Sequence, residues 1–139
     1  MKIQIINGPN LNLLGTREKS IYGGQSFEGY LALLVKRFPS VDIGYYQSNV
    51  EGEIINALHQ AGASCDAIVL NAGAYTHSSI AIHDAIAAIP AKVVEVHISN
   101  LYAREEFRHK SLITSKCVGL ISGFGLEGYA MAIQYFLAP

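Results

Sequence analysis

The chain has 139 residues, a length that fits a single domain over residues 1–139. Half of its residues are hydrophobic and only 15% are charged, well below the roughly 25% usual in soluble domains, so we expect part of its surface to be buried between copies of the chain in a homo-oligomer. The net charge is −1 and no basic run occurs, which argues against nucleic acid as a partner.

Strands and helices are predicted to alternate along the chain. The expected strands are short β-branched or apolar runs, over residues 2–7, 41–47, 67–71, 93–98 and 117–122. Helices with one apolar face are expected over residues 27–38, 51–61, 80–89 and 129–137. This alternation with short links predicts an α/β fold, a doubly wound parallel sheet of five strands with helices on both faces and right-handed crossovers.

Polar residues and glycine mark the ends of the expected helices. Gly62 follows the last apolar position of the second helix and is expected to end it. The candidate caps are Ser26 for the first helix, Ser48 or Asn49 for the second, and Ser78 or Ser79 for the third.

The cysteines and the N-terminal residues indicate the cellular compartment of the protein. Cys65 and Cys117 are isolated, without the paired spacing of a zinc site or a redox motif, so reduced thiols are expected. The apolar run at residues 3–6 stops at Asn7-Gly8-Pro9 and is too short for a signal peptide or a membrane span. We therefore expect a cytoplasmic protein that does not contact a membrane.

The fourth expected strand carries two ionisable side chains on one face. Glu95 and His97 are two positions apart, so in a strand they point the same way. A buried carboxylate and a buried imidazole are each costly alone, so they should contact each other or a ligand. The chain then leaves the sheet and supplies Ser99, Arg104 and Arg108. Because ligands of open α/β sheets bind beyond the carboxyl ends of the strands, this exit suits a small anionic substrate.

Two other loops should reach the same edge of the sheet. The loop over residues 10–24 is about fifteen residues long, and loops of that length in compact domains are usually functional or disordered. The loop over residues 72–77 leads from the third strand into the third helix. The side chains expected to converge are Asn10, Arg17, Tyr22, Asn71, His77, His97, Ser99 and Arg108.

Other chemistries fit the sequence less well. The run Gly123–Gly128 matches the dinucleotide fingerprint GxGxxG, but no strand and acidic residue follow it, so a tight strand-to-helix turn is favoured and a flavodoxin-like nucleotide-binding module is kept as an alternative. His77 and His83 lack the spacing of a helical metal-ligand pair. No lysine or cysteine stands where a Schiff base or thiol nucleophile would form.

General acid–base chemistry remains. A tyrosine starts near a pKa of about 10, and lowering this to near neutrality takes roughly 4 kcal/mol. One guanidinium at about 4 Å supplies roughly that much at an effective dielectric of about 20, and Arg17 is in the same loop as Tyr22. Such a phenolate could remove a proton next to a carbonyl while His97 protonates a departing hydroxyl, a β-elimination of water.

Four blocks of residues carry a resemblance to a known family. They are INGPNLNLLG at residues 6–15, Arg17-Glu18 with Tyr22-Gly23, LNAGAYTH at residues 70–77, and EVHISN at residues 95–100 with Arg104-Glu105 and Arg108. In this order they resemble type II 3-dehydroquinate dehydratase, a flavodoxin-like enzyme of the shikimate pathway, over the whole chain.

The resemblance implies a role for each residue of the reaction. Tyr22 would remove the proton at C2 of 3-dehydroquinate, and Arg17 would lower its pKa and stabilise the transition state. Asn10 would help to hold the enolate through a water. His97, with Glu95 behind it, would protonate the leaving C1 hydroxyl to give 3-dehydroshikimate. The implied substrate-binding residues are Asn71, His77, Asp84, Ile98, Ser99 and Arg108, with Asp84 reaching the site of a neighbouring subunit.

The family is a dodecamer built from trimers and uses no metal or organic cofactor, so the same is expected here. Many members have proline where this chain has Lys19, so the first loop is expected to be more mobile. The sequence leaves open whether the reaction serves aromatic amino acid and chorismate biosynthesis or the breakdown of quinate.

Overall fold

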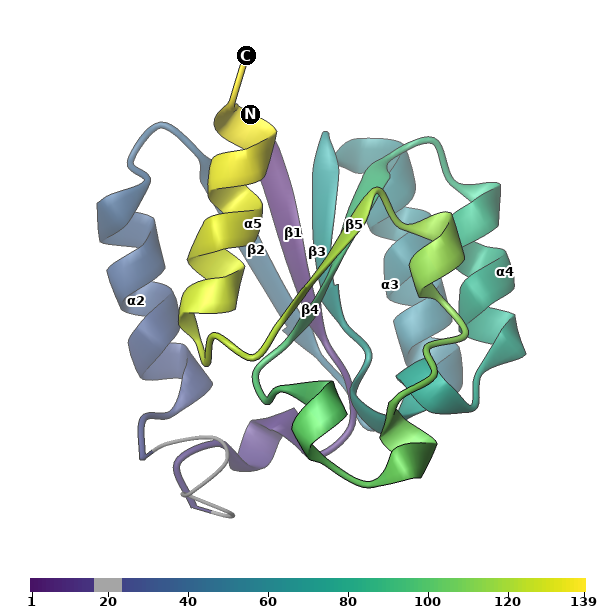
Figure 1. The fold of residues 1–139 in the computed structure, drawn as a ribbon. Coiled ribbons are helices and arrows are strands. Elements are labelled where there is room, and N and C mark those ends of the chain that lie inside the picture. The colour runs from purple at the N-terminus through teal and green to yellow at the C-terminus, as the bar shows by residue number, and fades with distance from the viewer. Residues whose placement is uncertain (17–23) are drawn as a thin grey trace.

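The computed structural model describes residues 1–16 and 24–139 and arranges them around a parallel sheet (Figure 1). Neighbouring strands are hydrogen-bonded in the order β2-β1-β3-β4-β5, which is the order of flavodoxin-like doubly wound sheets. The strands are Lys2–Asn7 (β1), Asp42–Gln47 (β2), Ala67–Asn71 (β3), Lys92–His97 (β4) and Gly119–Ser122 (β5). The predicted five-stranded parallel sheet is confirmed.

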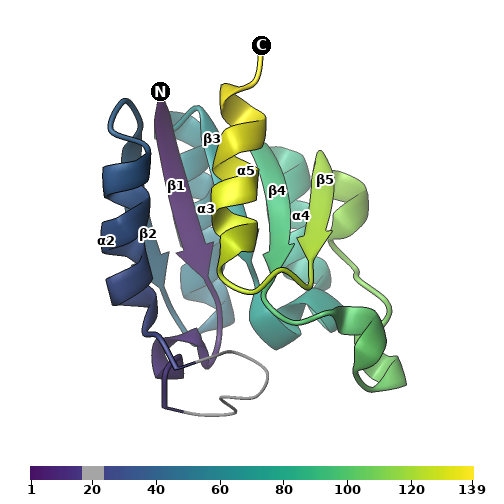
Figure 2. The ribbon, with the colours of Figure 1, turned by 60° about the vertical axis from the view of Figure 1, so that its left-hand side comes forward.

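Helices cover both faces of the sheet. They are α2 (Phe27–Arg37) and α5 (Glu127–Leu137) on one face, and α3 (Glu51–Ser64) and α4 (Ile80–Ala88) on the other (Figure 1 and Figure 2). Alternate side chains of a strand point to opposite faces. Ile5 and Val69 therefore pack in the core under α2 and α5, while Ile6 and Leu70 pack in the core under α3 and α4. The doubly wound arrangement is confirmed.

Strand β4 differs from the other central strands in what it places on one face. Val94 and Val96 belong to the core under α2 and α5. Glu95 and His97 point to the opposite face, where they are 0% and 5% exposed. The segment over residues 109–117, which leads from β4 to β5, supplies the side chains that contact Glu95. An ionisable pair is thus buried on the face of the sheet that α3 and α4 cover.

The serine caps were predicted correctly for two helices. The side chain of Ser26 accepts a hydrogen bond from the N–H of Gly29 at the start of α2, and that of Ser79 accepts one from Ile82 at the start of α4. At the other end of the sheet, β5 begins at Gly119, later than predicted, because a short 3-10 helix, η5 (Thr114–Lys116), occupies the residues before it.

The start of α3 at Glu51 was predicted correctly, but its cap and its end were predicted wrongly. The helix continues to Ser64 instead of ending at Gly62, and its N-cap is Val50 instead of Ser48 or Asn49. Gly62 serves packing between helices: a Cβ built on it would lie 2.6 Å from the Cβ of Ile89, just after α4. Because glycine has no side chain, α3 and α4 can approach each other closely at this position. In the sequence, a glycine placed there looks like the end of a helix, but its role is this packing contact.

Two substitutions in α3 test this reading. We expect Gly62→Ala to lower the free energy of unfolding by about 1–3 kcal/mol, because the new methyl group overpacks the contact with Ile89. Gly52→Ala, in the same helix, meets no atom within 4 Å and should raise the free energy by about 0.5 kcal/mol through helix propensity. Urea unfolding measures both variants, and a stabilised Gly62→Ala would contradict the packing role.

Candidate active site

Polar side chains gather where β1, β3 and β4 end. Asn7 and Asn71, the last residues of β1 and β3, are paired across the sheet, and His97 ends β4. A pocket opens at this edge. It is lined by Pro9, Asn10, Leu11, Asn71, Gly73, Ala74, His77, His97, Ile98, Ser99, Leu101, Arg104 and Arg108. Most of the predicted site residues are therefore brought together, as the topology of an open α/β sheet requires.

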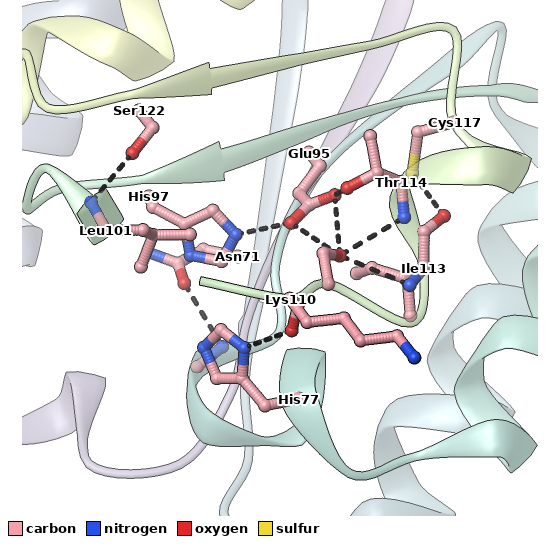
Figure 3. Close-up of polar contacts among 12 residues, drawn as sticks. Asn71, His77, Glu95, His97, Leu101, Lys110, Ile113, Thr114, Cys117 and Ser122 are labelled. Atoms are coloured by element: carbon pink, nitrogen blue, oxygen red, sulfur yellow. Dashed lines mark hydrogen bonds and ion pairs between the residues drawn. The ribbon is translucent and has the colours of Figure 1, made fainter. Parts of the chain in front are cut away.

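His97 is held by Glu95 at the inner wall of this pocket. Its Nε2 lies 2.5 Å from Oε2 of the buried Glu95 carboxylate (Figure 3). This is the contact predicted from their spacing in a strand. Because the carboxylate takes up Nε2, Nδ1 is the ring nitrogen left for a substrate, and it has no hydrogen-bond partner among the residues described. The pair can therefore present one nitrogen to a ligand in a fixed orientation.

The amide of Asn71 is locked by two contacts. Its Nδ2 donates to the hydroxyl of Tyr129 at 2.9 Å, and its Oδ1 accepts from the N–H of Gly73 at 3.1 Å. The Tyr129 hydroxyl donates in turn to Oδ1 of Asn7 at 2.7 Å. Tyr129 is fully buried, and burial raises the pKa of its phenol, so the hydroxyl keeps its proton. This chain fixes which end of the Asn71 amide faces the pocket.

His77 faces His97 across the pocket. Its Nδ1 lies 2.8 Å from the carbonyl oxygen of Lys110, and a carbonyl only accepts, so Nδ1 carries the hydrogen and Nε2 is left with a lone pair. The His77 and His97 rings are 6.3 Å apart between centroids, at 26° to each other. A ligand hydroxyl lying between them could donate to Nε2 of His77, and it could accept from Nδ1 of His97 when that ring carries both of its hydrogens.

Two arginines give the mouth of the pocket a positive charge. Arg104 Nη1 donates to the hydroxyl of Ser99 at 3.3 Å, and Arg108 Nε donates to Oε1 of Glu105 at 3.0 Å. The pKa of Glu105 is lowered by its own backbone N–H and by both arginines, so it stays ionised. Both guanidinium groups line the pocket, and guanidinium groups suit an anionic ligand.

The three loop residues Asn10, Arg17 and Tyr22 and the helix residue Asp84 complete the predicted set. Asn10 lines the pocket with a left-handed backbone, φ 70°, which asparagine tolerates, and its N–H donates to Asn49. Asp84 does not line its own chain's pocket: its side chain is 70% exposed on α4 and accepts from His83. Arg17 and Tyr22 lie outside the described residues.

The glycine run at residues 123–128 makes the turn from β5 to α5. Gly123 and Gly125 have φ values of 98° and 62°, a left-handed backbone that glycine adopts readily. Their N–H groups donate to the carbonyl oxygens of His97 and Ile98, so they are committed to the strand exit and cannot also cradle a pyrophosphate. The turn therefore supports the site and does not form a dinucleotide-binding loop.

Three site-supporting residues were missed from the sequence: Ser111, Thr114 and Tyr129. Tyr129 lies on the apolar face of the last expected helix, so it was interpreted only as a core residue. Ser111 and Thr114 precede the fifth strand, and no local sequence motif marks them as site residues. The thiol of Cys117 also lies near Glu95, and burial, with this carboxylate, raises its pKa to about 12. It is therefore a protonated structural group at neutral pH.

Metal ligands and membrane-spanning segments were also considered. Across residues 1–16 and 24–139, no cluster of three or more histidine, cysteine, aspartate or glutamate side chains is placed to hold a metal ion. None of the helices in these ranges combines the length and apolar character needed to cross a bilayer.

The chain is similar to known proteins over nearly its whole length. A family model described as dehydroquinase class II matches residues 1–137. The chain is 55% identical over 135 residues to the 3-dehydroquinate dehydratase of an Exiguobacterium species, covering 96% of this chain and 92% of that protein. It is 53% identical over 135 residues to the protein of the same name from Caldicellulosiruptor bescii, covering 95% and 93%.

Solved structures show the same likeness. The type II dehydroquinase from Butyrivibrio crossotus has a TM-score of 0.96 to this chain at 48% identity, with 99% of this chain and 98% of that one covered. The type II dehydroquinase from Propionibacterium acnes has a TM-score of 0.93 at 39% identity, with 97% and 94% covered.

Proposed function

The chain belongs to the class II dehydroquinase family, and we propose that it is a hydro-lyase, a 3-dehydroquinate dehydratase that works by acid–base catalysis through an enolate. The observation that carries the proposal is the buried His97–Glu95 pair, which presents one free ring nitrogen to a pocket flanked by two arginines. Neither a metal nor an organic cofactor takes part in the proposed steps.

His97 acts as the general acid in this proposal. A base removes a proton from C2 of 3-dehydroquinate, and the electron pair of the C–H bond moves toward the C3 ketone to form an enolate. When the enolate collapses, the C1–O bond breaks and the leaving hydroxyl takes the Nδ1 proton of His97, which enters this step as the imidazolium and leaves it neutral with its hydrogen on Nε2. The products are water and 3-dehydroshikimate, whose new C1=C2 bond is conjugated with the ketone. Glu95 holds the ring in place throughout.

Tyr22 is the proposed base, with Arg17 as the cation that lowers the pKa of its phenol. Both assignments come from the sequence and from the family resemblance, since the two residues lie outside the described part of the chain. Asn10, which lines the pocket, is proposed to hold a water against the enolate oxygen. The base and the acid would then act on two neighbouring carbons of the substrate.

Substrate binding is assigned to the other residues of the pocket. Asn71 and His77 present a locked amide and an imidazole to the substrate hydroxyls. The backbone at Ile98 and Ser99, with Arg108, is proposed to bind the carboxylate. These groups line one pocket, which supports the assignment. An anion of this kind would also suit the two guanidinium groups that line the pocket.

Asp84 is proposed to complete the pocket of a neighbouring subunit in a dodecamer built from trimers. Its carboxylate is exposed and does not line its own chain's pocket, so it is available to another copy. The low charge fraction of the chain agrees with extensive contacts between subunits. We place the reaction in the cytoplasm, in the shikimate pathway that leads to chorismate and the aromatic amino acids.

A turnover assay tests the proposed function. Purified protein mixed with 3-dehydroquinate should produce a rise in ultraviolet absorbance from the conjugated enone of the product. Borohydride added together with substrate should leave the enzyme active, because no lysine forms an imine. Folded protein that gives no absorbance rise would refute the activity, and inactivation by borohydride would refute the acid–base mechanism.

A further inference from the structure

The segment between β4 and β5 encloses the Glu95 carboxylate with hydroxyl groups. We propose that Thr114 and Ser111 are positioning residues for His97: their hydroxyls hold Glu95 as a charged acceptor, and Glu95 in turn fixes the orientation and tautomer of the imidazole. This proposal rests on the role of His97 in the proposed function, which it deepens. Neither hydroxyl touches the pocket, so both act through Glu95.

The direction of the Ser111 hydrogen bond is fixed by its neighbours. The Ser111 oxygen accepts the N–H of Ile113 and the N–H of Thr114, each at 3.2 Å. These two contacts use both of its lone pairs. Its hydrogen must therefore point to Glu95, whose Oε2 and Oε1 lie 3.1 Å and 3.3 Å away. Ser111 is a donor to the carboxylate and cannot accept a proton from it.

Thr114 completes the shell from the other side. Its Oγ1 donates to Oε1 of Glu95 at 2.5 Å, while His97 occupies Oε2. Glu95 is 0% exposed, and a buried carboxylate is tolerated only where hydrogen bonds replace its water. Both oxygens of Glu95 are thus matched by donors. Such a shell favours the ionised carboxylate over the protonated acid, whose own hydrogen would need a free acceptor.

The consequence for His97 is a fixed tautomer. An ionised Glu95 only accepts, so Nε2 of His97 must carry a hydrogen toward it. Any second proton that His97 gains or gives up is then on Nδ1, the nitrogen on the pocket side. Without the hydroxyl shell, Glu95 could rotate, and the ring could present the wrong nitrogen. Outer hydrogen bonds of this kind at metal-bound histidines typically contribute about 10- to 100-fold to activity.

Thr114→Val tests the proposal with little change in shape. We expect kcat to fall about 10- to 100-fold while KM changes by less than about two-fold, since no substrate contact is removed. Thr114→Ser restores a hydroxyl and should recover most of the loss. Thr76→Val is the matched control: Thr76 is fully buried and its hydroxyl has no partner among the described residues, so the same change should leave kcat unaltered.

A second measurement separates positioning from a purely structural role. Nitrogen NMR of the substrate-free protein with 15N-labelled histidine reports which ring nitrogen of His97 carries hydrogen. We expect the Nε2–H form in the wild type and in Thr114→Ser, and a mixture of tautomers in Thr114→Val. Unchanged His97 signals in Thr114→Val would overturn the proposal, whether kcat falls or not. Because this measurement needs no turnover, it remains decisive even if the protein proves inactive on 3-dehydroquinate.

Discussion

Replacing His97 with glutamine is expected to lower kcat by about 10²- to 10⁴-fold, the range that a positioned general acid contributes. The glutamine amide can still donate to Glu95, so the buried carboxylate keeps a partner and the fold is preserved. It cannot, however, give up a proton to the C1 hydroxyl of the substrate. KM should change by only a few-fold. Steady-state rates from the ultraviolet assay measure both constants.

Hydrogen exchange at C2 shows which step fails in His97→Gln. In deuterium oxide, the variant should still exchange the C2 hydrogen of 3-dehydroquinate, because enolate formation precedes the step that needs the acid. Proton NMR of the unreacted substrate would follow the loss of that signal. A variant with kcat within ten-fold of the wild type would remove His97 from the acid role. Loss of exchange together with dehydration would place His97 in the first step instead.

The position of His97 could be predicted because it depends on local geometry and simple topology. A side-chain period of two in a strand puts Glu95 and His97 on one face, and a doubly wound sheet brings the carboxyl ends of β1, β3 and β4 together. The bounds of β1 and β3 were also predicted correctly, since both runs are rich in isoleucine or valine and end at an asparagine, Asn7 or Asn71. Both the strand periodicity and the order of strands and helices can be taken from the sequence without knowing any contact between distant side chains.

The parts that could not be predicted depend on contacts between distant residues. Thr114 and Ser111 meet Glu95 only because η5 folds back over β4 before the chain enters β5. Tyr129 reaches Asn7 from the opposite end of the sequence. A hydroxyl or phenol that serves a buried network has the same local pattern as one that faces water or fills a core, so the sequence holds no separate signal for it.

Tyr22→Phe is expected to lower kcat by about 10²- to 10⁴-fold and to abolish C2 hydrogen exchange as well. Phenylalanine keeps the ring but has no oxygen to accept the C2 proton, so the reaction stops before the enolate forms. The two catalytic variants should therefore differ qualitatively: His97→Gln exchanges hydrogen without dehydration, and Tyr22→Phe does neither. The dissociation constant of 3-dehydroquinate, measured by calorimetry, should stay within a few-fold of the wild-type value.

Tyr135→Phe supplies the matched control for this change. Tyr135 lies on α5, is 52% exposed and does not line the pocket, so its loss of a hydroxyl should leave both kcat and exchange at wild-type levels. If Tyr22→Phe retained rapid C2 exchange, another group would have to be the base. In the proposal, Arg17 is the group that allows a tyrosine to act as a base near neutrality. If Tyr22 is not the base, Arg17→Ala should also retain C2 exchange. Exchange in both variants would exclude Tyr22 as the base.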